Sequence, residues 1–140
     1  MATVRRFEDL EVWRLARELA LDIYQTTLTH SFVNDFELKE QIRKSSGSVM
    51  DNISEGFERG GRKEFIHFLG IAKGSSGEVR SQLYRALDRK HLNSDKFETL
   101  REKVILLSSK LSNLISYLKK SEQKGFKFHE EEGDYGNLEL

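Results

Sequence analysis

The sequence predicts an all-α protein that folds as an antiparallel four-helix bundle. Apolar residues recur at steps of three and four along four long segments, which is the period of an amphipathic helix. No segment alternates apolar and polar residues over a strand's length, which argues against a sheet. The chain has 140 residues, the size of one domain, and it contains no proline that would interrupt a helix.

The first two helices are predicted over residues 10–27 and 36–57. In the first, the residues expected to face the core are Trp13, Ala16, Ala20, Ile23 and Tyr24. Asp9 is expected to cap its N-terminus. In the second, the core positions are Leu38, Ile42, Ser45, Val49, Ile53 and Gly56. Gly60 and Gly61 then end this helix.

The third helix begins near Arg62, and a break at Asn93 and Ser94 starts the fourth. The core positions of the third are Phe65, Leu69, Ala72, Ser76, Val79, Leu83 and Ala86. In the fourth, a 3-4 repeat places Phe97, Leu100, Val104, Leu107, Leu111, Leu114 and Leu118 on one seam. Four such helices with short turns favour up-down-up-down packing around one core.

The chain divides into a bundle over residues 1–120 and an acidic tail over residues 121–140. The bundle carries 21 Lys and Arg against 17 Asp and Glu, and the tail carries 2 against 6. We expect the tail to be disordered because its periodicity stops. Its aromatic residues, Phe126, Phe128 and Tyr135, leave docking onto the bundle or a partner open.

Composition narrows the possible functions. Without cysteine, the chain has no disulfide, thiolate nucleophile or Cys-ligated zinc. The N-terminus lacks a signal-like apolar run, and no stretch approaches the ~20 apolar residues of a membrane span, so a cytoplasmic location without a membrane partner is expected. A mildly basic bundle permits nucleic-acid binding, although a mixed solvated surface explains the same charges.

One pattern invites an enzyme interpretation, the Glu-x-x-His pair Glu64 and His67. Ferritin-like di-iron sites use two such pairs on different helices, plus a Glu from each of the other two. The other comparable pair, Asp88 and His91, lies 24 residues further along the same helix, about 36 Å away. The two pairs therefore cannot share a metal, and the helical wheel turns His67 outward. We expect no enzyme activity, metal or cofactor.

A stripe of small residues lies on the outer side of the third helix: Gly70, Gly74, Gly77 and Ser81. Glycine within a helix costs about 1 kcal/mol relative to alanine, so close approach by another helix is the favoured explanation. A packing surface on the outside of the bundle indicates a subunit interface. A locally weak helix is the alternative.

Polar residues follow one edge of the second helix and one edge of the third. They predict an inter-helix polar seam that includes Asn52, Glu55, Arg59, Glu64, Glu78 and Gln82. If these edges meet, Arg59 faces Glu64 and Lys44 faces Glu78. Such exposed pairs contribute at most about 1 kcal/mol each.

The opposite hand of this hairpin would bring Lys39 and Arg43 toward Arg80, an unfavourable arrangement of like charges.

Cations also follow the other edge of the third helix and its end. The candidates for phosphate contact are Arg62, Lys73, Arg80, Arg85, Arg89 and Lys90. In one isolated subunit a solvated edge explains them, but repetition around an oligomer would add these charges into one field.

Three motifs resemble those of the 23S ribosomal RNA intervening-sequence proteins. They are Phe7–Trp13, the Asn-Ile-Ser-Glu-Gly segment Asn52–Gly56, and Glu64–Leu83, which matches the family's third helix almost throughout. The resemblance covers residues 7–118. The chain differs by having Val33 and Met50 where members often have proline, and by its acidic extension.

The resemblance implies a small bacterial cytoplasmic bundle that assembles as a ring-like homopentamer, with no enzyme activity attached. Relatives of similar fold are accessory subunits of diversity-generating retroelements, where a basic pentamer binds nucleic acid and a reverse transcriptase. We therefore expect a homo-oligomeric scaffold for RNA or an RNA–protein complex. The alternative is a protein–protein adaptor, such as a reverse-transcriptase accessory subunit, that does not contact nucleic acid.

Overall fold

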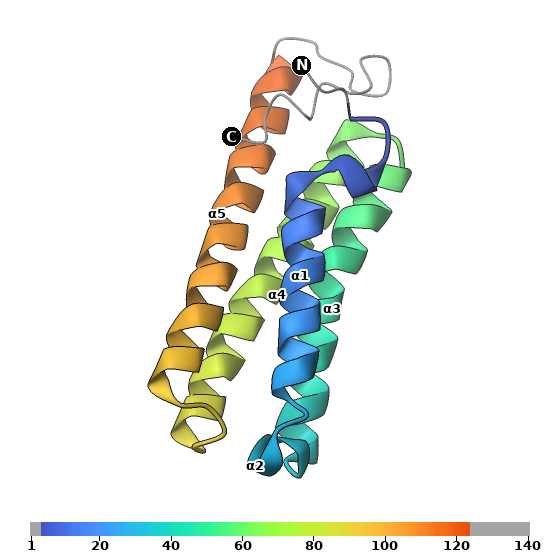
Figure 1. Ribbon diagram of the computed structural model, residues 1–140. Coiled ribbons are helices and arrows are strands. Elements are labelled where there is room, and N and C mark those ends of the chain that lie inside the picture. Colours follow the sequence, from blue (N-terminus) through green and yellow to red (C-terminus); the bar gives the residue numbers. More distant parts are fainter. Residues whose placement is uncertain (1–3, 124–140) are drawn as a thin grey trace.

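The computed structural model describes residues 4–123 and is all-helical there. In order, the elements are η1 (Phe7–Asp9), α1 (Glu11–Thr26), α2 (His30–Val33), α3 (Phe36–Glu58), α4 (Arg62–Asp88) and α5 (Ser94–Gln123). Figure 1 shows α1, α3, α4 and α5 running side by side, with each helix antiparallel to the one that follows it in this set. The predicted four-helix bundle is confirmed. Residues 121–123 of the predicted tail belong to α5, and the rest of the tail, residues 124–140, lies outside the described residues.

The core follows the predicted faces of α3, α4 and α5. Every predicted core position of these three helices is buried, including the whole 3-4 seam of α5, where Leu100, Leu111 and Leu118 are fully enclosed. The regular spacing predicted these faces well because each helix turns one continuous stripe toward its neighbours. No helix in the described part is long and apolar enough to cross a membrane.

The predicted face of α1 is wrong in part. Its buried residues are Val12, Ala16, Leu19, Ile23 and Thr26. Ala16 and Ile23 were predicted, but Trp13 and Ala20 are half-buried, and Tyr24 is 48% exposed. The core stripe is thus turned by about one residue from the one that the large aromatic side chains indicated.

Two predictions about helix ends have different outcomes. Asp9 does not cap α1, because the N-cap is Leu10 and Asp9 instead ends the turn η1, where Arg6 pairs with it. Asn93 does cap α5, since its side-chain oxygen accepts the backbone N–H of Lys96 at 2.8 Å. The single-turn helix α2 was not predicted.

The α3–α4 hairpin brings two backbones unusually close together. Gly60 adopts a left-handed conformation (φ +82°) directly after α3, which glycine tolerates without strain. Further up α3, a Cβ on Gly56 would lie 2.7 Å from the Cβ of Phe68 and 3.2 Å from the ring of Phe65. Gly56 therefore sets how closely α4 packs against α3.

Candidate interaction surfaces

A polar seam joins α3 and α4, and of the six residues predicted for it Gln82 makes a hydrogen bond across the contact. The Ser45 hydroxyl donates to Gln82 Oε1 at 2.5 Å, and the hydroxyl oxygens of Ser48 and Ser75 lie 3.1 Å apart. The Asn52 amide donates to Ser48 within α3 at 2.9 Å. These bonds establish that the polar edges of the hairpin meet.

The alternative hairpin hand is therefore wrong. Lys39 donates to the Val33 carbonyl at 3.1 Å, and Arg43 donates to Thr27 Oγ1 at 2.8 Å. Both contacts lie on the side of α3 that faces α1 and α2, away from α4 and Arg80. The like charges are separated, as the electrostatic argument required.

The charged members of the seam are arranged more loosely than expected. Arg59 binds Glu55 on its own helix at 2.8 Å. Hydrogen bonding and charge attraction from Glu55, with a longer-range attraction from Glu64, raise the pKa of the Arg59 guanidinium. Lys44 and Glu78 line one open groove of about 590 Å³ between α3 and α4, together with Ser48, Ser75 and Gln82.

The structure does not gather the six predicted phosphate contacts into one site. Lys73 and Arg80 are exposed along the middle of α4, whereas Arg62 is half-buried at its start. Arg85 and Arg89, near its end, form ion pairs with Glu37 on α3. The two groups of cations thus lie in different electrostatic settings, because Lys73 and Arg80 form no ion pair with a described residue whereas Arg85 and Arg89 are paired with acids.

The end of α4 closes with a turn that the sequence did not reveal. Lys90 has a left-handed backbone (φ 62°), and the N–H groups of Lys90 and His91 bind the carbonyls of Leu87 and Ala86. This is the Schellman arrangement, in which glycine usually occupies the position held here by Lys90. It directs the next residue, His91, back toward the start of α3.

Asp35 is the hub of this end of the bundle. Its carboxylate caps α3 by accepting the Leu38 N–H, and it lies 2.8 Å from both Arg89 Nη1 and His91 Nε2. The His91 and Arg89 hydrogen bonds lower the pKa of Asp35 from 3.8 to about 2. This hub was not predicted from the sequence, although an aspartate directly before a helix is a recognisable cap signal.

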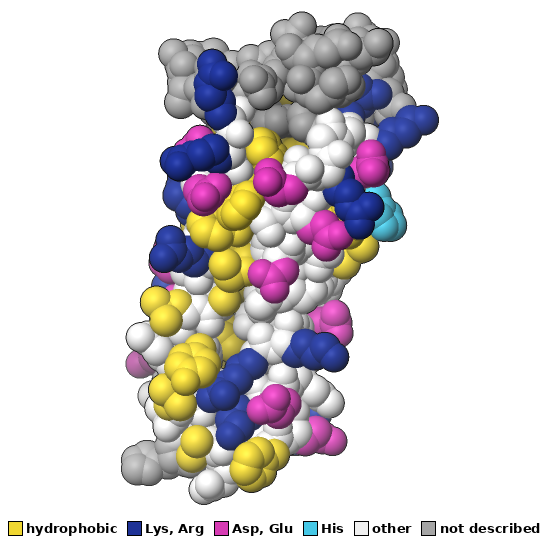
Figure 2. Space-filling view, turned by 90° about the vertical axis from the view of Figure 1, so that its right-hand side faces the viewer, with side chains coloured by type: hydrophobic (Ala, Val, Ile, Leu, Met, Phe, Trp, Pro, Cys, Tyr) yellow, Lys and Arg dark blue, Asp and Glu magenta, His cyan; other side chains and the backbone are white. Residues whose placement is uncertain are grey.

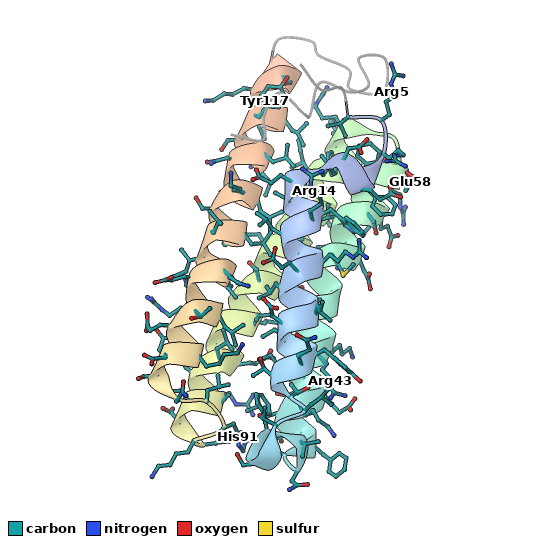
Figure 3. The ribbon with its side chains drawn as sticks, viewed as in Figure 1. Arg5, Arg14, Arg43, Glu58, His91 and Tyr117 are labelled. Atoms are coloured by element: carbon teal, nitrogen blue, oxygen red, sulfur yellow. The ribbon has the colours of Figure 1, made fainter. Side chains whose placement is uncertain are left out.

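His91 is also held on its other side. Its Nδ1 lies 2.8 Å from the Ser31 hydroxyl, and its ring stacks on Phe32 with centroids 4.9 Å apart. Figure 3 shows His91 at the end of the bundle that carries α2, opposite the N-terminal end. The short helix α2 is thus fastened to the α4–α5 turn.

The predicted small-residue stripe faces outward. Gly70, Gly74, Gly77 and Ser81 are exposed, and a Cβ on any of the three glycines would meet nothing within 4 Å in this chain. His67 is exposed as the helical wheel predicted. Among residues 4–123, no three His, Asp or Glu side chains lie close enough together to hold a metal ion.

Large apolar side chains are exposed at several places on the bundle. Leu21, Tyr24, Leu28 and Phe36 lie in α1 or between α1 and the start of α3. Ile71 and Tyr84 lie on α4, and Leu106 lies on the outer side of α5. Of these residues, Tyr24 was predicted to lie in the core.

The chain is similar to known proteins in both sequence and fold. The profile of the 23S rRNA-intervening sequence protein family matches residues 8–113. The chain belongs to this family. No curated protein matches the chain.

Among solved structures, the fold is similar to a crystal structure of a protein of unknown function from the S23 ribosomal protein family of Bacteroides thetaiotaomicron VPI-5482. The two share 22% sequence identity with a TM-score of 0.70, over 75% of this chain and 95% of that one. At this identity the likeness establishes the shared bundle alone.

Proposed function

We propose that this family member is a non-enzymatic, homo-oligomeric scaffold that binds RNA or an RNA–protein complex. The observation that carries the proposal is the outer surface of α4. There Lys73 and Arg80 are exposed without an ion pair to a described residue, on the edge next to the open glycine stripe. Assembly through the glycines would repeat these cations around the oligomer, as the ring-like homopentamers of the family suggest.

RNA binding is expected to depend on assembly because the affinity for phosphates grows with the number of cations that contact them. One subunit has few uncompensated cations, and each phosphate contact contributes modestly. Several subunits around one axis superimpose their potentials and raise both affinity and association rate. Under this proposal, assembly and RNA binding depend on one another.

The test is Gly74→Leu, which places a bulky side chain on the open stripe. Light scattering should show a smaller species while circular dichroism remains helical. Gly47→Leu is the matched control, because Gly47 is also open but lies on α3. A wild-type protein that is monomeric at micromolar concentration would contradict the oligomer.

RNA binding is tested separately with Lys73→Gln combined with Arg80→Gln. Fluorescence anisotropy should show weaker binding and a shallower dependence of affinity on salt, by about one phosphate contact for each cation removed. An oligomer whose RNA affinity is unmeasurable at low salt would contradict this half of the proposal.

The second candidate function is a protein–protein adaptor that never contacts nucleic acid, for example an accessory subunit of a reverse transcriptase. Exposed Leu21, Leu28 and Leu106 favour it, because exposed apolar side chains are available to contact another protein. An oligomer without salt-dependent RNA binding would favour this function over the first.

A further inference from the structure

A band of paired aromatic and cationic side chains runs along the α1–α3 face. Arg17 lies over the Trp13 ring at 5.7 Å, Arg43 over Tyr24 at 4.5 Å, and Lys39 over Phe36 at 4.3 Å, each from cation to ring centroid. We call these six residues the cation–aromatic strip. All are on α1 and α3, and Figure 3 shows Arg43 where α3 lies beside α1.

Two of the three aromatic rings of the strip are exposed, and the third, Trp13, is half-buried. Phe36 is 70% exposed and Tyr24 is 48% exposed. Figure 2 views the side of the bundle that carries α3, and hydrophobic side chains gather there in a band along the left of the view, with Lys and Arg side chains among them. Exposed apolar surface with polar side chains around it is typical of an interaction site.

The cations of the strip keep their charge uncompensated. Arg17 contacts the Trp13 ring, Lys39 binds a backbone carbonyl and Arg43 binds a threonine hydroxyl. None of these three forms an ion pair with a carboxylate among the described residues. Elsewhere on the bundle, Arg59, Arg85, Arg89 and Lys103 are all paired with acids.

Several acidic residues of α1 and α3 point away from the strip and bind cations on other helices. The acids Glu18 and Asp22 of α1 turn toward α5, where both bind Lys103. On α3, Glu37 turns toward α4. These three acids therefore form their ion pairs on the sides of α1 and α3 that face away from the strip.

The acids that lie nearest to the strip do not cancel its charge. Glu40 lines a shallow pocket with Arg43 and Lys44, and Asp51 and Glu55 line the neighbouring one with the same two cations. Glu55 is paired with Arg59, and the accessible cations Arg17, Arg43 and Lys44 outnumber Glu40 and Asp51. The surface around the strip therefore stays net positive.

We propose that the cation–aromatic strip binds single-stranded RNA, with bases stacked on the exposed rings and guanidinium planes and phosphates held by the cations. This inference rests on the proposed RNA-binding function and gives it a site away from α4. Proteins that bind single strands combine a positive track with aromatic platforms, because every base has a stacking face and every nucleotide a phosphate. Trp13 and Tyr24 are eleven residues apart on α1, about 16 Å, which is room for more than one base.

The strip fits a strand of RNA better than a second copy of the chain. A protein subunit docked there would bury Arg17 and Arg43 away from water, and a buried cation is costly unless a carboxylate meets it. RNA brings one phosphate with every base. Base stacking and charge neutralisation are then satisfied by the same ligand.

The test uses the full chain and a short, unstructured oligouridylate as probe. Tyr24→Ala combined with Phe36→Ala should weaken binding at least about fivefold, the low end of the loss of one stacked base. Tyr24→Trp should retain binding, since it keeps a stacking surface. Leu106→Ala is the matched control, because it removes a side chain of equal exposure (48%) from α5.

A second arm separates stacking from charge. Arg43→Gln should reduce the slope of log affinity against log salt by about one. A blunt-ended RNA duplex without unpaired bases should bind more weakly than the single strand, because its bases are not free to stack on the protein.

The outcomes distinguish this inference from the proposed function. If wild-type protein binds the oligouridylate and the Tyr24/Phe36 double variant binds it equally well, the strip is not the site, while the RNA-binding function stands. If wild-type protein binds no RNA, both fall. If the double variant changes the oligomer size in light scattering, the strip is a contact between copies of the chain, and the inference is overturned.

Discussion

The two sides of α3 are built on opposite principles. Toward α4, small residues such as Gly56 and Ser75 allow close approach, and the polar groups along the contact bind one another. Toward α1, large rings lie under cations that have no acidic partner. On the α4 side of α3, the polar groups thus find their partners within the chain. On the α1 side, aromatic rings and cations remain available to bind another molecule.

This difference teaches where stability and recognition reside in the bundle. Close packing and satisfied hydrogen bonds stabilise a fold but present little to a partner. Exposed rings and unpaired charges contribute little to folding and are free to bind. Substitutions on the α4 side should therefore change unfolding, and substitutions on the α1 side should change binding.

The largest expected effect on stability comes from Gly56→Leu. The first added atom, Cβ, would already lie 2.7 Å from Phe68 Cβ, so α4 must move away from α3. We expect a loss of about 3 kcal/mol or more in the free energy of unfolding, measured in urea, because overpacking in a close contact is poorly relieved.

Gly47→Leu is the matched substitution on the same helix. A Cβ there meets nothing within 4 Å, and leucine favours a helix over glycine by roughly 0.5–1 kcal/mol. The variant should be as stable as wild type or slightly more stable. If Gly56→Leu and Gly47→Leu lost equal free energy of unfolding, close packing of α3 against α4 at Gly56 would be contradicted.

Asp35 tests the end of the α3–α4 contact. Asp35→Ala removes the cap of α3 and the contacts to Arg89 and His91, and should cost about 1–2 kcal/mol at neutral pH. Asp35→Asn keeps a capping oxygen but no charge, so it should lose less. The difference between the two variants in urea isolates the cap from the ionic contacts.

Asp35 also gives the bundle a pH dependence. Because the folded state lowers the pKa of Asp35 from 3.8 to about 2, its charge stabilises the fold above pH 4, and this contribution is lost as pH falls toward 2. Asp35→Asn should therefore show a smaller drop in melting temperature between pH 4 and pH 2. An unchanged drop would mean that other carboxylates govern acid unfolding.

Sequence patterns predicted the side of α3 that faces α4 and missed the side that faces α1. The α4 contact follows from local spacing, since one stripe of small and apolar residues repeats along each helix. Trp13 and Tyr24 misled the prediction for α1, because a large ring normally indicates the core. At the surface the Tyr24 ring lies under Arg43, nineteen positions further along the chain on another helix, and no local period encodes such a pair.

Local sequence patterns also predicted the candidate sites only in part, because they do not encode contacts between helices. The outward position of the glycine stripe follows from the helical wheel and was predicted. The separation of Arg85 and Arg89 from Lys73 and Arg80 depends on Asp35 and Glu37, which only the tertiary fold brings to the end of α4. A count of cations along one helix therefore overestimated the positive surface of that helix.

A smaller effect is expected within the α3–α4 seam from Ser75→Ala. Its hydroxyl is buried and lies 3.1 Å from that of Ser48, so its loss should cost about 0.5–1.5 kcal/mol. Ser48→Ala and the double variant complete a cycle that measures the coupling between the two hydroxyls. Additive losses would show that the two serines do not act together.

The smallest expected effect is that of Arg43→Ala on stability, and it bears most directly on the comparison. The substitution removes the contact with the Tyr24 ring and the bond to Thr27 Oγ1. Thr27 keeps a partner, because its hydroxyl also donates to the Tyr24 carbonyl at 2.7 Å, so no buried polar group is left unpaired. We expect a change within about 0.5 kcal/mol in urea, as for other surface substitutions. A loss above about 2 kcal/mol would mean that the α1 side of α3 is also structural, and any RNA-binding defect of strip variants would then have to be measured on protein shown to be folded.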